Sequence, residues 1–273
     1  VVAVALNKKR PGCADNVVRN AAALCFQVTL LSVVGDDEAG ATLCRLMTEE
    51  GVNASLYPDP AISTTVKLRV IGRQQQLLRI DFETPPSHEV LQNKLVEFER
   101  LLPDCDAVVL SDYGKGGLAH IADMIGMARA AGKQVLVDPK GDDYARYAGA
   151  SAITPNRGEL REVVGRWRDE ADLAERAQKL RKELALEALL VTRSEEGMSL
   201  FSDAGVFNEP ARAREVFDVS GAGDTVIATL ASMLSIGQTW DASVHVANVA
   251  GGIVVGKLGT AVVTRDELLA ALN

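Results

Sequence analysis

Short apolar runs that end in polar or glycine-containing loops alternate with stretches of helical spacing over residues 88–201. These runs are Ala107–Leu110, Gln134–Val137, Ala152–Thr154 and Ala188–Thr192, followed by a hairpin-like finish, Met198–Phe201. Such alternation predicts a doubly wound α/β fold, in which a mostly parallel sheet is flanked by helices. The carboxyl ends of parallel strands share one edge of a sheet, where ligands bind. We therefore expect the polar loops to meet at that edge.

The amino-terminal part begins in the same alternating order. Val1–Leu6 and Val28–Val34 have the apolar, β-branched character of strands, and Asn16–Leu24 and Glu38–Glu50 have the spacing of helices. Gly51 closes the second of these helices. The expected succession up to this point is strand, helix, strand, helix.

Two extended runs, Thr64–Val70 and Gln76–Phe82, interrupt this order and predict a β-hairpin. Alternation along the two runs places charged side chains, among them Lys67, Arg69 and Arg79, on one face of each strand. Such a half-exposed hairpin can form a lid over a site or a dimer surface. The alternative, the solvated outer face of an edge hairpin, has equal weight on the pattern alone.

Composition excludes several classes of protein. A hydrophobic content of 47% with 24% charged residues is typical of a folded enzyme or binding protein. The net charge of −8 argues against a nucleic-acid-binding surface. The sequence has no apolar run of membrane-span length, and its first residues, Val1–Leu6, do not have the pattern of a signal peptide. We expect a single domain over residues 1–273, incomplete at its amino end, with residues 1–10 and 62–83 as lid or dimerisation strands.

The four cysteines lie far apart and form no C-x-x-C pair, and the three histidines do not cluster. Neither a zinc site nor a disulfide framework is therefore indicated. Reduced thiols are the rule in the cytoplasm, which is the expected location.

The run Asp218–Thr225, DVSGAGDT, lies directly before a long apolar stretch of helical character. Glycines let a backbone approach a ligand closely, and the free N–H groups at a helix start attract an anion. A carboxylate at the same place would repel a phosphate that is only bound. It makes sense if Asp224 takes a proton from an attacking hydroxyl while the backbone stabilises a transferring phosphoryl group. An ordinary helix start with Asp in its first turn is an equally weighted alternative.

Neither a P-loop nor a G-x-G-x-x-G fingerprint is present, so phosphate must be held by other means. Asn156 and Glu159 are three residues apart at a predicted helix start. Such a pair can orient a hydrated cation through its water shell. Spacing alone favours a plain helix start with an acidic first turn.

The run Asp218–Asp224 resembles the carboxy-terminal signature of the ribokinase-like (PfkB) carbohydrate kinases, D-[ST]-x-G-A-G-D, with the second and third positions exchanged. The resemblance implies a ribokinase-like fold, ATP as phosphoryl donor and Mg²⁺. It assigns Gly221, Ala222 and Gly223 to an anion hole and Asp224 to the catalytic base.

Further motifs occur in the order of that family. Asn156 and Glu159 resemble its N-x-x-E motif, which is tied to magnesium, through water, and to nucleotide phosphates. The loop from Thr192 to Gly197 resembles its nucleotide loop, and residues 248–259 resemble the region that flanks the adenine. The implied nucleotide residues are Asn156, Glu159, Thr192, Ser194, Glu195, Gly197, Gly223 and Asn248. A monovalent cation near residues 256–260 is a further possibility in this family.

The central motifs are similar to those of the D-glycero-D-manno-heptose 7-phosphate kinase branch, which forms the 1,7-bisphosphate for the heptose of bacterial lipopolysaccharide. They include KLRV at 67–70, SDYGKG at 111–116 and DPKG at 138–141. This resemblance implies heptose 7-phosphate and ATP as substrates and a homodimer formed through the lid strands. The substrate residues that it implies are Gly12, Asn16, Arg69, Arg79, Asp112 and Lys140.

Two features depart from the family pattern. Where the family usually reads Gly-Gly-Ala-Ala-Asn, this chain reads Gly12-Cys13-Ala14-Asp15-Asn16, and the family's opening strand with its sugar-binding Asp has no counterpart. A kinase of another sugar or sugar phosphate is therefore an alternative. A non-catalytic sugar or nucleotide binder is an alternative from another class.

Overall fold

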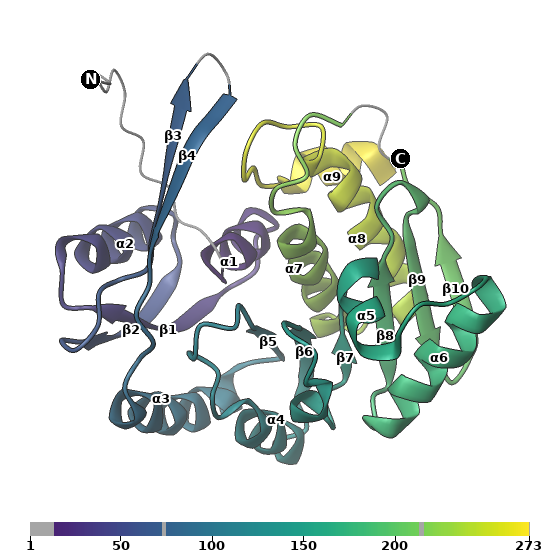
Figure 1. The fold of residues 1–273 in the computed structure, drawn as a ribbon, viewed down its shortest axis with the longest axis horizontal. Coiled ribbons are helices and arrows are strands. Elements are labelled where there is room, and N and C mark those ends of the chain that lie inside the picture. The colour runs from purple at the N-terminus through teal and green to yellow at the C-terminus, as the bar shows by residue number, and fades with distance from the viewer. Residues whose placement is uncertain (1–13, 73–74, 213–215, 273) are drawn as a thin grey trace.

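The computed structural model describes residues 14–72, 75–212 and 216–272. Two sheets with covering helices form the body of the molecule, and a separate β-hairpin projects from it (Figure 1). Val1–Leu6 and Gly12, which were assigned to a strand and to the sugar site, lie outside the described residues. None of the described helices is both long and apolar enough to cross a membrane.

The larger sheet has six strands in the order β10-β9-β8-β7-β6-β5. Strands β5 to β8 run parallel, while β9 and β10 continue the sheet antiparallel. The strands are β5 (Ala107–Ser111), β6 (Gln134–Asp138), β7 (Ala152–Ile153), β8 (Ala188–Thr192), β9 (Met198–Ser202) and β10 (Gly205–Glu209). The predicted succession of parallel strands with a hairpin-like finish is confirmed.

Helices cover both faces of this sheet, as the doubly wound prediction requires. One face carries α3 (His88–Leu101), α4 (Ile121–Ala130), α5 (Arg157–Val164) and α6 (Glu170–Glu183), and the other carries α1 (Ala14–Ala23), α7 (Ala222–Ser235) and α8 (Trp240–Val254). Helix α9 (Arg265–Leu272) packs on α8. Short 3-10 turns lie at Leu102–Asp104, Tyr144–Tyr147 and Ser194–Glu196.

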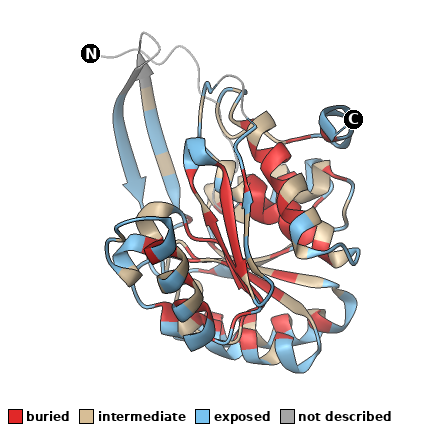
Figure 2. Cartoon of the chain, turned by 90° about the vertical axis from the view of Figure 1, so that its right-hand side faces the viewer, coloured by how far each residue is buried: buried red, intermediate tan, exposed pale blue. Residues whose placement is uncertain are grey.

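Successive residues of the central strands enter two different hydrophobic cores. Val135 and Val137 of β6 pack with the α3–α6 side, whereas Leu136 between them packs with the α1, α7 and α8 side. This alternation follows from the two-residue period of a strand, and both faces are apolar because both are covered. The buried parts of α7 and α8 stand out in red in Figure 2.

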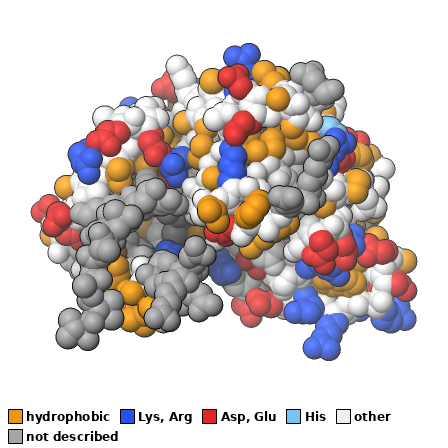
Figure 3. All heavy atoms as spheres, turned by 90° about the horizontal axis from the view of Figure 1, so that it is seen from above, with side chains coloured by type: hydrophobic (Ala, Val, Ile, Leu, Met, Phe, Trp, Pro, Cys, Tyr) orange, Lys and Arg blue, Asp and Glu red, His pale blue; other side chains and the backbone are white. Residues whose placement is uncertain are grey.

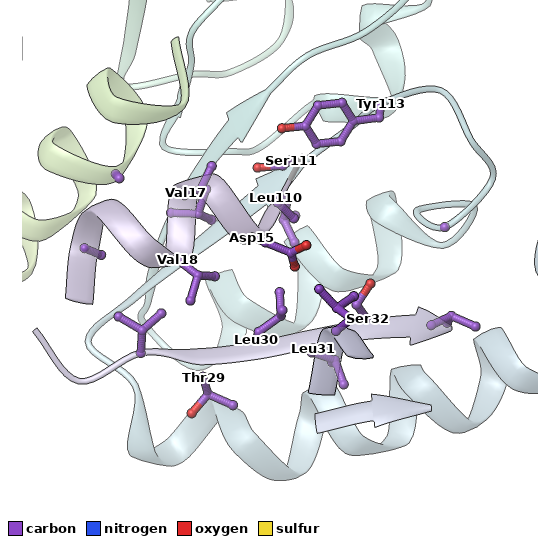
Figure 4. Close-up of a pocket in the computed structure, with 18 of the residues that line it drawn as sticks. Asp15, Val17, Val18, Thr29, Leu30, Leu31, Ser32, Leu110, Ser111 and Tyr113 are labelled. Atoms are coloured by element: carbon purple, nitrogen blue, oxygen red, sulfur yellow. The ribbon is translucent and has the colours of Figure 1, made fainter. Parts of the chain in front are cut away.

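The smaller sheet pairs β1 (Thr29–Gly35) in parallel with β2 (Asn53–Asp59), and α2 (Glu38–Glu49) lies beside it. Within the described residues β1 and β5 each pair on one side only, so the doubly wound sheet is present in two parts. A cavity of about 2250 Å³, lined by residues of α1, β1 and β5, lies between them (Figure 4). Strand β2 was missed by sequence reasoning because it has neither an uninterrupted apolar run nor regular alternation.

The predicted hairpin is confirmed as β3 (Val66–Gly72) paired antiparallel with β4 (Gln75–Phe82). It projects away from the body and is largely pale blue, that is exposed, in Figure 2. Cross-strand pairs such as Leu68 with Ile80 form an apolar face, and the pair Lys67 with Asp81 belongs to the opposite, charged face.

Candidate active site

Helix α7 begins at the edge of the sheet where the parallel strands end. Its N-cap, Gly221, has a φ of +80°, a left-handed conformation that favours glycine. A Cβ at this position would lie 2.4 Å from Nδ2 of Asn16. Among the described residues, no hydrogen bond takes the N–H groups of Gly223 and Asp224 in the first turn. The predicted helix start is confirmed. The N–H of Ala222 donates to the carbonyl of Val219 at 3.2 Å, so the role of Ala222 in an anion hole stays a prediction.

Two donors hold the carboxylate of Asp224. Nδ2 of Asn16 donates to Oδ2 at 2.8 Å, and the hydroxyl of Tyr113 donates to Oδ1 at 3.0 Å. Burial raises the pKa of Asp224, and these two hydrogen bonds oppose that rise. The carboxylate is thus fixed in orientation, partly shielded from water and kept within reach of a nearby hydroxyl.

Asn16 is fully buried on α1, and a network ties it to α7. Nδ2 of Asn20 donates to the carbonyl of Asn16 at 2.8 Å, and the hydroxyl of Thr225 donates to Oδ1 of Asn20 at 3.1 Å. Oδ1 of Asn16 is buried and has no hydrogen-bond partner among the described residues. A buried acceptor of this kind costs free energy unless a ligand supplies a donor. The prediction that Asn16 binds a sugar hydroxyl fits this geometry.

The loop after β5 brings Tyr113 to the site, and Asp112 holds that loop in place. Oδ1 of Asp112 accepts from the N–H of Gly114 at 2.8 Å, and Oδ2 accepts from the hydroxyl of Tyr147 at 2.9 Å. Asp112 was assigned to the substrate, and that role stays a prediction, since Oδ1 already binds the loop and Oδ2 already binds Tyr147. Sequence reasoning gave Tyr113 no role, because only the fold brings it to Asp224.

Acidic side chains gather beside the base. Asp138, at the end of β6, has its pKa raised to about 7, first by burial and then by the charges of Asp224 and Glu159. Asn156 and Glu159 form a reciprocal capping box at the start of α5, and Nζ of Lys140 lies 3.1 Å from Oε1 of Glu159. The structure thus brings the N-x-x-E pair and Lys140 together.

No cluster of three or more His, Cys, Asp or Glu side chains within the described ranges forms a ready metal cage. The donors available near Asp224 are oxygens from Asp138, Asn156 and Glu159. Mg²⁺ prefers oxygen donors and usually keeps several waters when it is bound together with a phosphate substrate. The donor set therefore fits a hydrated Mg²⁺.

Some of the predicted nucleotide residues lie next to Asn156 and Glu159. Thr192 and Asn156 form a parallel bridge, which joins the N-x-x-E motif to the loop containing Ser194 and Glu195. Gly197 closes this loop with a φ of +90°, and a Cβ there would lie 2.1 Å from the carbonyl oxygen of Glu209.

Asn248 is buried on α8, and its Nδ2 donates to the carbonyl of Pro210 at 2.7 Å. It therefore holds Pro210, directly after β10, against α8. Its nucleotide role stays a prediction.

The hairpin borders the cavity that lies between β1 and β5. Arg69 lines the cavity together with Asp15 and Tyr113, and it lies directly across from Arg79 in the register of β3 and β4. Both arginines are exposed, and Nε of Arg79 contacts Asp81 at 3.0 Å. Viewed from above, acidic and basic side chains lie beside a hollow in this face (Figure 3).

A parallel sheet with a buried carboxylate and free backbone N–H donors at its carboxyl edge is the arrangement expected of a phosphotransferase of small molecules. A model of the pfkB family of carbohydrate kinases matches residues 3–266. The chain belongs to this family. The expected ribokinase-like kinase is therefore confirmed at the level of fold and class.

Individual relatives agree with this assignment. The chain is 57% identical over 268 residues to a D-beta-D-heptose 7-phosphate kinase of Bordetella bronchiseptica, covering 98% of this chain and 86% of the relative. It is 48% identical over 274 residues to the bifunctional protein HldE of Methylococcus capsulatus, covering 100% of this chain but 58% of that relative. Phosphofructokinase-2 of Escherichia coli, in complex with potassium, superposes with a TM-score of 0.78 at 18% identity, over 94% of this chain and 85% of that one.

Proposed function

We propose that this protein transfers the γ-phosphoryl group of ATP to the anomeric hydroxyl of D-glycero-D-manno-heptose 7-phosphate. The product is the 1,7-bisphosphate, an intermediate on the way to ADP-heptose and the lipopolysaccharide core. The observation that carries the proposal is the Asp224 carboxylate beside the free N–H groups at the start of α7. The identity to the Bordetella heptose 7-phosphate kinase supports the choice of sugar.

The residues of the chain divide the chemistry between them. Asp224 accepts the proton of the attacking hydroxyl, and the N–H groups of Gly223 and Asp224 donate to the charge that develops on the transferring phosphoryl oxygens. Asn16 holds Asp224 with its amide nitrogen. Its buried Oδ1 has no hydrogen-bond partner among the described residues and can accept from a substrate hydroxyl. A sugar hydroxyl on Oδ1 of Asn16 would lie close to the base.

Asp138, Asn156 and Glu159 would hold Mg²⁺ through its water shell. Bound there, Mg²⁺ neutralises charge on the nucleotide phosphates. The raised pKa of Asp138 supports this arrangement, because crowded carboxylates are relieved by a cation. Thr192, Ser194, Glu195, Gly197 and Asn248 would frame the nucleotide, and a monovalent cation would assist near residues 256–260.

Arg69 and Arg79 would hold the 7-phosphate of the sugar. They are direct cross-strand neighbours, and Asp81 contacts only Arg79, so a phosphate between the two guanidinium groups would offset the repulsion that remains. Guanidinium groups bind phosphate oxygens with two parallel hydrogen bonds, which suits this task. Lys140 would contribute positive charge near the reacting phosphoryl group, since it already contacts Glu159.

The apolar face of the hairpin would join two copies of the chain into a dimer. Val66, Leu68, Leu78, Ile80 and Phe82 are each between 37% and 51% exposed. An unpartnered apolar face on a projecting two-stranded sheet is typical of an association surface.

A coupled ADP-release assay tests the proposed function. Heptose 7-phosphate, fructose 6-phosphate and ribose are compared as acceptors, and ATP turnover without sugar is subtracted. The proposal expects the highest kcat/KM for heptose 7-phosphate. Preference for another sugar would show that the protein is a kinase of that sugar. Binding of sugar without turnover would show that it is a non-catalytic binder.

A further inference from the structure

We propose that Tyr113 is a positioning residue for the catalytic base, and that it sets both the orientation and the working pH range of Asp224. The inference rests on the proposed kinase function and adds a residue to it. The supporting contact is the hydrogen bond from the Tyr113 hydroxyl to Oδ1 of Asp224 at 3.0 Å. Figure 4 shows the Tyr113 side chain extending from the loop after β5, with its hydroxyl turned away from that loop.

The loop that carries Tyr113 is fixed on both sides of the ring. The N–H of Asp112 donates to the carbonyl of Asp138 at 2.9 Å, so the loop continues from the edge of the sheet. The carboxylate of Asp112 then accepts from Gly114 and from the fully buried Tyr147. Because the loop is already held in place, little conformational entropy is lost when the Tyr113 hydroxyl takes up its position. A group that orients a catalytic side chain needs such a rigid support.

Two donors divide the oxygens of Asp224 between them. Asn16 binds Oδ2 from helix α1, and Tyr113 binds Oδ1 from the loop after β5, so the carboxylate cannot rotate without breaking both bonds. Each carboxylate oxygen keeps a further lone pair that can accept the proton of the attacking hydroxyl. Hydrogen bonds to the ionised form also favour that form against the effect of burial, so Asp224 stays ready to accept a proton.

The Tyr113→Phe substitution removes the hydroxyl and keeps the ring. We expect kcat to fall roughly 10- to 100-fold, as for loss of a hydrogen bond to a charged group. KM for ATP should change little, and the acidic limb of the kcat/KM profile should move to higher pH. Asp138 is a titratable neighbour of Asp224, so the profiles of Tyr113→Phe and of the parent are compared at the same saturating Mg²⁺ concentration. The matched control is Tyr57→Phe, a tyrosine of strand β2 outside the site.

A double-mutant cycle separates positioning from a general structural role. In an Asp224→Asn background, Tyr113→Phe should have little further effect on the residual rate, because there is no base left to orient. An equal fold-loss in both backgrounds would overturn the inference. So would a Tyr113→Phe enzyme with the parent kcat and the parent pH profile. Inactivity of the parent protein on every sugar would instead refute the proposed function.

Discussion

Replacing Gly221 by Ala tests how the start of α7 is built. The left-handed conformation at φ +80° costs a residue with a side chain about 1–2 kcal/mol. The new Cβ would lie 2.4 Å from Nδ2 of Asn16, so the amide must move and its hydrogen bond to Asp224 is lost, at about 1 kcal/mol. Together these effects predict a loss of about 2–3 kcal/mol in the free energy of unfolding.

Thermal denaturation measures this loss, which corresponds to a fall in Tm of about 4–12 °C for a domain of this size. The matched control is Gly223→Ala, two residues further on, where a Cβ meets nothing within 4 Å and φ is not positive. The control should be as stable as the parent or slightly more so, since Ala favours a helix over Gly. Equal Tm values for the two variants would refute this account of the helix start.

Two further predictions concern a buried charge and the hairpin. Burial lowers the pKa of Lys94 from 10.5 to about 8. Below pH 8 the folded protein must therefore keep a buried charge, which lowers its free energy of unfolding by about 3 kcal/mol. Lys94→Met should therefore unfold at a higher temperature at pH 7. The gain in stability is reduced by the loss of the hydrogen bond from Lys94 to the carbonyl of Gly117. Its advantage should shrink between pH 8 and 10.5, where the parent's stability rises as the folded state sheds the proton that the unfolded chain keeps. A pH-independent difference would contradict this. Replacing Leu68 and Ile80 by Lys should convert a dimer to a monomer in sedimentation, whereas Lys67→Gln on the other face should not; a dimer in both variants would exclude the hairpin as the interface.

The sequence predicted the parts of the fold and site that depend on local pattern. The run from Gly221 to Asp224 can be recognised from its residue types and their spacing. The strands after residue 88 can be recognised from their apolar runs. Strand β2 was missed because Asn53–Asp59 has no such pattern. Its identity as a strand comes from parallel pairing with β1, which is a tertiary effect.

Contacts over long separations could not be predicted in the same way. Asn16 and Asp224 are 208 positions apart, and Tyr113 and Asp224 are 111 apart, so only the packing of α1, α7 and the loop after β5 reveals the three together. The roles of Asp112 as a loop support and of Gly221 as the place where Asn16 passes close to the backbone have the same origin.

The activity of Asp224→Asn tests the central claim most directly. The substitution keeps the shape of the side chain. Its amide oxygen can still accept from Nδ2 of Asn16 and its amide nitrogen can donate to the Tyr113 hydroxyl, but the proton acceptor is removed. With heptose 7-phosphate and ATP, the account predicts that kcat falls by about 10²–10⁴-fold while ATP binding and Tm stay close to the parent. A variant that turns over at nearly the parent rate would contradict the assignment of Asp224 as the base.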